Sequence, residues 1–217
     1  MSDVSRAPQS PAPQSPATQP PATATQPPTA QPPAAADPPA TRWSTRKTVT
    51  LALFTALSVI LSFVEIAVFP AAPYLKYDPS GVVAAFATFA YGPASGVIVG
   101  LVTAALHALI AGDPWGGVMM AIVVVCWVVP AGLVYKRKPT RTGALAALVV
   151  GAVFMLAGAI VGNILVTPVY SGTTVAAVLA LIVPVLLPFN IIKCVINIIL
   201  TWLLYAPLQQ LIETRAR

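Results

Sequence analysis

The feature that most limits the fold of this chain is an apolar run over residues 178–204 that carries one charge, Lys193. A membrane-spanning helix needs about 20 mostly apolar residues, so this run is long enough to cross a bilayer. Asn190, Lys193 and Asn197 are spaced i, i+3 and i+7, which places them on one helix face, and Thr201 extends the stripe. A lysine at the centre of a membrane helix costs roughly 2.5–3.5 kcal/mol on insertion scales. Lys193 therefore requires a partner, a wet cavity or a ligand.

Composition places the whole chain in the membrane. Hydrophobic residues make up 57% of the 217 residues and charged residues only 8%, whereas soluble domains carry about 25% charged residues. Between residues 48 and 206 the acids are Glu65, Asp78 and Asp113 alone. The net charge of +6 is read as a topology signal, because no basic patch interleaved with aromatic residues indicates nucleic-acid binding. We expect a multi-pass protein of the cell membrane.

Apolar runs and turn signals together predict an all-α membrane protein with six transmembrane helices. The run over residues 81–91 is too short to span unless it tilts or lies half buried in protein. Positive charges at residues 42–47, 136–141 and 215–217 all fall on one side under this count, so both termini are predicted to be cytoplasmic. The predicted helices cover residues 49–69, 81–91, 94–111, 118–135, 143–166 and 178–204.

The chain divides into a tail over residues 1–41 and a transmembrane substrate-binding domain over residues 42–217. Pro, Ala, Thr, Gln and Ser dominate the tail, which therefore has little apolar surface to bury and is predicted to be a disordered cytoplasmic segment. It lacks the apolar core of a signal peptide. A proline-ligand role and a simple solvated tail are both open interpretations.

Neither catalysis nor metal binding is expected from the residue patterns. Cys126 and Cys194 lie in apolar runs and are interpreted as small buried hydrophobes, and His107 has no cysteine or histidine at a ligand spacing. The chain contains no HExxH, GxSxG or Walker motif. It is therefore predicted not to be an enzyme and to carry no cofactor or metal.

The best candidate site is the polar stripe on the last helix. The amides of Asn190 and Asn163, at comparable depths, and the ammonium of Lys193 match the edge of a heterocycle carrying C=O and N–H groups. Pro184 and Pro188 interrupt the backbone hydrogen bonds just outside and could widen a cavity there. The alternative is hydrogen bonding between helices, which explains an asparagine well and Lys193 poorly.

The loop before the second helix, residues 71–80, is a candidate lid over that stripe, with Leu75 and Tyr77 as its substrate-binding residues. Tyrosines stack on planar ligands, although they also mark membrane interfaces. Lys76 and Asp78 are expected to be solvated, and Glu65 either pairs with a base or reaches water.

Several stretches together resemble a known family. They are Tyr-Leu-Lys-Tyr-Asp-Pro-Ser at 74–80, Ala-Thr-Phe-Ala-Tyr-Gly-Pro at 87–93, Gly-Asp-Pro at 112–114, Asn163 with Pro-Val-Tyr at 168–170, and Pro-Phe-Asn-Ile-Ile-Lys at 188–193. In this order and spacing the chain resembles the substrate-binding S components of energy-coupling factor (ECF) vitamin transporters, and among these the riboflavin-specific type. The chain departs from the family at Asp78-Pro79-Ser80-Gly81, where the family usually reads Asp-Phe-Ser-Asp, and at Thr103-Ala104, where the family often has Lys-Asn. Ligand contacts in the loop and on the third helix are therefore expected to differ.

The resemblance implies one riboflavin or related flavin held near the outer face, with Asn163, Asn190 and Lys193 hydrogen-bonded to its ring. It also implies that Ala52 and Ala56, a small-xxx-small pair on the first helix, contact a transmembrane coupling subunit that is powered by two cytoplasmic ATPases. Sister families bind thiamine, folate, pantothenate or biotin.

A hypothesis from another class is a membrane-anchored structural or signalling protein whose proline-rich tail recruits partners. It predicts that deletion of residues 1–41 abolishes function while Lys193→Ala does not, and the transporter hypothesis predicts the reverse.

Overall fold

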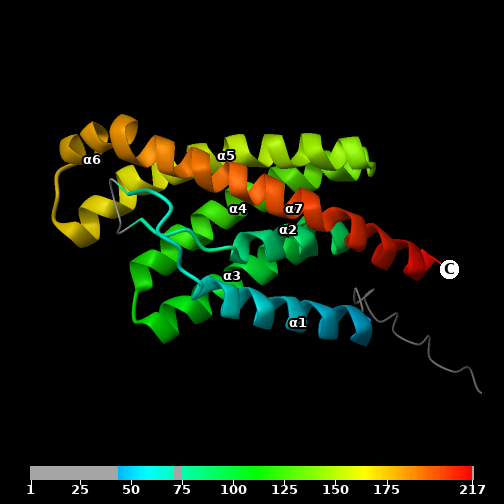
Figure 1. The fold of residues 1–217 in the computed structure, drawn as a ribbon. Helices are drawn as coiled ribbons and strands as arrows, with labels where there is room; N and C mark the ends of the chain where they lie inside the picture. Colours follow the sequence, from blue (N-terminus) through cyan, green and yellow to red (C-terminus); the bar gives the residue numbers. More distant parts are fainter. Residues whose placement is uncertain (1–43, 71–74, 217) are drawn as a thin grey trace, which may run out of the picture. The chain divides into compact units, whose positions relative to one another are not determined.

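The computed structural model describes residues 44–70 and 75–216, and the secondary structure of these residues is helical apart from one isolated bridge between Ile66 and Tyr77. The predicted tail over residues 1–41 and the Tyr74 position of the loop lie outside the described residues. The helices are α1 (Thr45–Ser62), α2 (Ser80–Tyr91), α3 (Pro93–Ala111), α4 (Pro114–Arg137), α5 (Arg141–Ser171), α6 (Val175–Leu181), the π-helix η1 (Ile182–Leu186) and α7 (Leu187–Ala216) (Figure 1).

Among the described residues, five apolar segments are long enough to cross a membrane, and α2 is a shorter apolar helix. These spans are α1, α3, α4, α5 and the continuous run Val175–Tyr205, which contains α6, η1 and part of α7. The expected all-α membrane fold is therefore confirmed. With 12 residues, α2 is about 18 Å long at 1.5 Å per residue, well short of a bilayer core of about 30 Å.

Helix α2 lies inside the protein rather than against lipid. Eight of its 12 residues are buried, and the helix packs against α1, α3, α4 and α7. Figure 1 shows it between α1 and α7. Its apolar sequence is satisfied by protein contacts instead of lipid, which explains how a helix too short to span is retained in the bundle.

Short polar and glycine-proline signals set the helix ends. Asp113 caps α4 by accepting a hydrogen bond from the backbone nitrogen of Gly116 at 2.9 Å, and Pro114 occupies the first helical position, where its missing N–H has no cost. Thr140 caps α5 in the same way through Gly143. At the end of α3, Gly112 adopts a φ of 69°, a left-handed conformation that favours glycine. The fourth helix was predicted to begin at residue 118, but it begins at Pro114, so the break between α3 and α4 consists of Gly112 and Asp113 alone.

The outer end of α5 differs from the prediction. The fifth helix was predicted to end at residue 166, but α5 continues through Pro168 to Ser171. The hydroxyl of Thr167 donates to Asn163 Oδ1 at 3.1 Å, and the hydroxyl of Ser171 donates to the Thr167 carbonyl at 2.6 Å. A proline removes one backbone donor from a helix, and these local side-chain bonds help to stabilise the turn around it.

The final span is interrupted where the prolines predicted it. Pro184 lies inside the π-helix η1, and Pro188 is the second residue of α7. Short π-helical segments inside α-helices are often found at functional sites. The widened turn ends at Leu186, one turn before Asn190, so it directly precedes the polar stripe.

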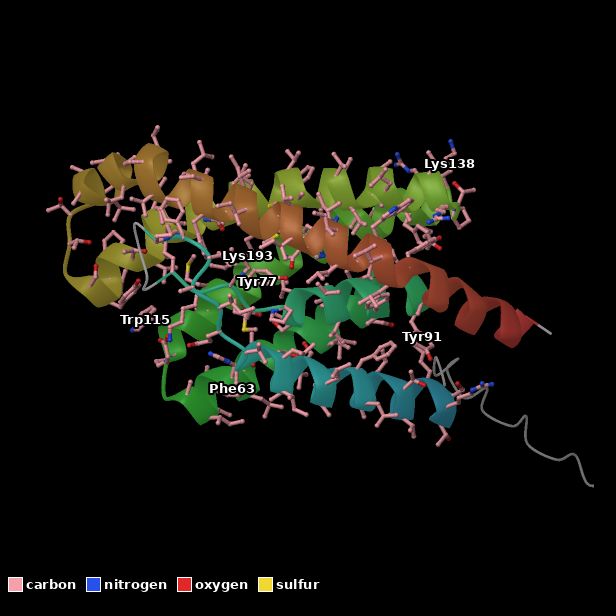
Figure 2. The ribbon with its side chains drawn as sticks, in the orientation of Figure 1. Phe63, Tyr77, Tyr91, Trp115, Lys138 and Lys193 are labelled. Carbon is pink, nitrogen blue, oxygen red and sulfur yellow. The ribbon has the colours of Figure 1, made fainter. Side chains whose placement is uncertain are left out.

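The bundle core lies where α4 packs against α3 and α5. Trp127, Val128, Leu148 and Met155 are almost fully buried there. The first residues of α1, the turn between α4 and α5, and the end of α7 lie at the same end of the bundle, with Lys138 marking the turn (Figures 1 and 2). The cationic segments at residues 46–47 and 136–141 are therefore gathered at one end, as the predicted topology requires.

Candidate binding cavity

A cavity of about 430 Å³ opens between the α1–α2 loop, α3, α4, α5 and the α6–α7 segment. Small-molecule sites usually measure about 300–1,000 Å³, so one small ligand fits this space. The loop contributes Leu75, Lys76 and Asp78, α5 contributes Asn163, and α7 contributes Asn190 and Lys193. In Figure 2, Lys193 lies toward the end of the bundle that carries Phe63 and Trp115, away from Lys138. The predicted residues Leu75, Asn163, Asn190 and Lys193 therefore line a single cavity.

The two asparagines are held by their own helices. Asn190 is 5% exposed and donates through Nδ2 to the Leu186 carbonyl at 2.8 Å. Asn163 donates to the Ala159 carbonyl at 2.8 Å and accepts from Thr167. Neither side chain bonds to another helix within the described residues, which does not fit the alternative that these asparagines join helices together. Each primary amide has two N–H donors and two acceptor lone pairs, so each retains capacity for a further partner.

Lys193 forms an ion pair with Asp78, which was expected to be solvated. The distance from Lys193 Nζ to Asp78 Oδ2 is 3.1 Å, and the two side chains are 17% and 18% exposed. Ser80 donates to the other carboxylate oxygen through its backbone nitrogen and its hydroxyl. Burial by itself raises the pKa of Asp78, but the Lys193 ammonium and the hydrogen bonds from Ser80 and Lys193 outweigh it and hold the pKa below its ordinary value. The expectation that Asp78 is solvated is wrong.

The second pair of loop charges is more exposed. Lys76 pairs with Glu65, and the two side chains are 49% and 39% exposed. Glu65 was expected either to pair with a base or to reach water, and the structure shows the pair. Both residues lie at the rim of the cavity. The loop thus carries one ion pair facing solvent and one facing the bundle.

Tyr77 does not line the cavity, although it was predicted to bind substrate. Its ring is 2% exposed, and its hydroxyl donates to Asn197 Oδ1 at 2.8 Å. Its backbone exchanges two hydrogen bonds of 2.8 Å with Ile66 in a short antiparallel bridge. Successive side chains of an extended segment point to opposite sides, so Tyr77 enters the bundle while Lys76 faces outward. Burial, followed by the nearby Asp78 charge, raises the pKa of Tyr77, and the phenol stays a neutral donor.

Two side-chain hydrogen bonds therefore hold the loop against α7, and their partners on α7 lie one helical turn apart. Tyr77 bonds to Asn197, and Asp78 bonds to Lys193. The sequence prediction did not place Asp78 at the cavity. The signal that could have placed it there is the scarcity of acids, since between residues 48 and 206 only three are available to compensate a buried lysine.

The cavity rim contains two aromatic contacts that the sequence did not indicate. His107 accepts from or donates to Ser62 Oγ through Nδ1 at 2.9 Å, and its ring stacks on Phe63 with centroids 4.7 Å apart. Trp115 stacks on Tyr170 with centroids 6.3 Å apart. No group of three or more metal-ligating side chains occurs among the residues that the structure describes.

Ala52 and Ala56 lie on an exposed face of α1, whereas Leu51 and Ser58 point into the bundle. Large apolar side chains, including Leu53 and Leu57, flank them on the same exposed side. Both alanines are exposed and could meet another protein. Their assignment to a coupling interface stays a prediction.

Helices long and apolar enough to cross the bilayer, together with a cavity lined by polar side chains, define a multi-pass membrane protein built to hold a small molecule. The family model described as "ECF transporter, substrate-specific component" matches residues 46–205. The chain belongs to this family, as the motif resemblance implied, and is a transporter's substrate-binding component.

Individual relatives agree with the family assignment. The chain is 29% identical over 175 residues to riboflavin transporter RibU of Staphylococcus aureus (strain TCH60), covering 77% of this chain and 93% of the relative. It is 27% identical over 180 residues to riboflavin transporter FmnP of Bacillus subtilis (strain 168), covering 77% and 94%. A solved structure of the S component of a bacterial ECF transporter superposes with a TM-score of 0.69 at 28% identity, covering 78% of this chain and 98% of that one.

Proposed function

We propose that this chain binds riboflavin in the cavity and delivers it for uptake as the substrate-specific subunit of an ECF transporter. The observation that carries the proposal is the convergence of Asn163, Asn190 and Lys193 on one cavity of about 430 Å³. The names of RibU and FmnP support the choice of vitamin.

The chemistry of the lining suits a flat heterocycle. Amide and ammonium groups complement ring C=O and N–H groups along one edge, and small-molecule sites generally combine a few such groups with apolar walls. Those walls are Leu75, Met119, Met120, Val123, Leu186 and Phe189. In this proposal Leu75 contacts the ligand from the loop, and Tyr77 positions the loop by binding Asn197 instead of touching the ligand.

A binding titration tests the proposal directly. The full chain, purified in detergent, is titrated with riboflavin, thiamine, folate and pantothenate, and flavin fluorescence quenching reports riboflavin binding. We expect Asn190→Ala to weaken riboflavin binding about 2- to 13-fold, because a neutral hydrogen bond is worth about 0.5–1.5 kcal/mol. Lys193→Ala should weaken it further, because bonds to charged groups are worth about 1.5–3 kcal/mol.

The matched control is Ile191→Ala, on the same turn of α7 but 45% exposed on the outer face. It should leave the affinity unchanged. A preparation that is colourless and ignores riboflavin but binds another vitamin of the panel would overturn the choice of riboflavin, and equal effects of Ile191→Ala and Asn190→Ala would overturn the site.

We also propose that the exposed face of α1 meets the coupling subunit of an ECF module, which is driven by two cytoplasmic ATPases. Support comes from Ala52 and Ala56, which are exposed, small and four residues apart, a pattern that allows close helix contact. The double exchange of Ala52 and Ala56 to leucine should preserve riboflavin binding and reduce co-purification with the coupling subunit. Val153→Leu, on the exposed face of α5, is the control. Undiminished co-purification of the double variant would refute this contact.

A further inference from the structure

A second, smaller chamber adjoins the Asp78–Lys193 pair. Its volume is about 30 Å³, which accommodates about two water molecules, since one water needs roughly 10–15 Å³. Asp78 and Lys193 line both this chamber and the larger cavity, so the two spaces meet at the ion pair. The helices contribute Ser58, Thr103, Trp127, Met155 and Asn197 to its walls.

Two buried polar atoms of these walls lack a partner among the described residues. They are Thr103 Oγ1 and Trp127 Nε1, and both side chains are 1% exposed. Buried polar groups are almost always hydrogen-bonded, to ordered water where protein offers nothing. An indole N–H cannot accept, so its missing partner must be an acceptor.

The remaining lining also favours an acceptor. Lys193 has three ammonium hydrogens and donates one bond to Asp78, and the bond that Asn197 Nδ2 makes among the described residues is to the sulfur of Met155 at 3.9 Å. With the indole of Trp127, the lining therefore holds several N–H donors that have no oxygen acceptor among the described residues. A cation is disfavoured beside the lysine, and a species bearing an oxygen lone pair satisfies the donors.

We propose that the inner chamber is a second polar subsite that takes an oxygen hydrogen-bond acceptor, supplied by ordered water or by one hydroxyl or carbonyl oxygen of the substrate. The acceptor binds Trp127 Nε1 and Thr103 Oγ1 and lies against the inner side of the ion pair. The choice between the two sources rests on the proposed riboflavin function, whereas the existence of the subsite does not.

Proton NMR on the full chain tests the subsite. The protein is labelled with ¹⁵N-tryptophan, and the Trp127 indole signal, one of four, is assigned as the one missing from Trp127→Phe. Trp202→Phe, near the cationic end, is the matched assignment control. In the ligand-free protein we expect a cross-peak between the Trp127 indole N–H and water.

Addition of riboflavin separates the sources. A water cross-peak that persists identifies water, and its replacement by a cross-peak to the protons of the ribityl chain identifies a substrate hydroxyl. An indole N–H without any cross-peak to water or ligand in either sample overturns the subsite. That result is independent of the riboflavin titration, which can succeed or fail without it.

A variant pair provides a second measurement. Thr103→Val preserves side-chain shape but removes one bond from the bound oxygen, so the water cross-peak of Trp127 should weaken. Thr201→Val is the control, because Thr201 Oγ1 is equally buried and unpartnered within the described residues yet does not line the chamber. Equal effects of the two exchanges on the Trp127 signal would contradict the proposed site.

Discussion

The Asp78–Lys193 pair should be strongly coupled in the folded protein. At the 3.1 Å that separates Nζ from Oδ2, two unit charges attract by about 5 kcal/mol at an effective dielectric constant of 20 and by about 1 kcal/mol in bulk water. Both side chains are less than one-fifth exposed, so the interaction lies between these limits, and desolvation offsets part of it. We expect a coupling free energy of about 2 kcal/mol, which corresponds to about 30-fold in an equilibrium constant.

A double-mutant cycle measures this quantity. Asp78→Asn and Lys193→Met remove one charge each, and the double variant removes both. Unfolding in detergent is followed for the four proteins without ligand, so that binding does not contribute. The double exchange should destabilise the protein less than the sum of the two single exchanges, because each single exchange leaves one charge with no counter-ion.

The chain supplies its own control pair. Glu65 and Lys76 form an ion pair in the same loop region, but they are 39% and 49% exposed. Exposed ion pairs contribute about 0.2–1 kcal/mol, so the cycle of Glu65→Gln and Lys76→Met should give a clearly smaller coupling. If the Asp78–Lys193 coupling falls to the value of the exposed pair, the burial argument for Lys193 is wrong.

Three further results are expected from the same stability assay. Tyr77→Phe should destabilise the protein by about 1–3 kcal/mol, because it leaves the buried Asn197 Oδ1 without its donor at 2.8 Å. The folded-state pKa of Asp78 is below its ordinary 3.8, so the advantage of the wild type over Asp78→Asn should be constant down to about pH 5 and shrink in more acidic buffer. An advantage that already shrinks between about pH 8 and about pH 5 would contradict the assignment. Gly96→Ala should cost about 1–3 kcal/mol, because its Cβ would lie 2.7 Å from a backbone carbonyl of α2, whereas Gly81→Ala, whose nearest contact would be 3.6 Å, should be tolerated.

The positions of the long helices could be predicted from the lengths of the apolar runs, the charges between them and the turn residues. Apolar runs near 20 residues leave few alternatives to spanning helices, and a turn such as Gly112-Asp113-Pro114 supplies a left-handed cap, an N-cap and a first helical residue in succession. The short run at residues 81–91 was predicted as one of six transmembrane helices, and as too short to span unless it tilts or lies half buried in protein. Its position among four other helices could not be predicted, because that position depends on contacts between segments that are distant in the sequence.

The outer end of α5 shows why a local signal misled. Pro168 and Gly172 look alike as turn signals in the sequence, but only Gly172 ends the helix, with a φ of 67°. A proline near a helix end loses one bond and does not require termination. The extra turn brings Tyr170 beside Trp115 at the cavity rim, a contact that no sequence pattern indicated.

The loop before α2 shows a different limit. Alternation in an extended segment assigns Lys76 and Tyr77 to opposite sides, but it does not say which side meets the bundle. The sequence predicted Tyr77 as a ligand contact because a tyrosine suits a planar ring, and the structure buries it against Asn197 instead. Asn163, Asn190 and Lys193 could be grouped correctly because helical spacing and depth fix both direction and height.

The position of the loop and the burial of Lys193 are thermodynamically linked. The counter-ion of Lys193 comes from the loop, 115 residues earlier in the chain, and not from a neighbouring helix. Any movement that withdraws Asp78 therefore leaves the ammonium in the cavity with fewer compensating groups, and such an uncompensated charge is costly. In the proposed function, a ligand that offers Lys193 a carbonyl oxygen would lower this cost, so ligand binding and loop opening would both act on the same ammonium group. The counter-ion that the loop supplies explains how a lysine can persist in a span that otherwise carries no charge.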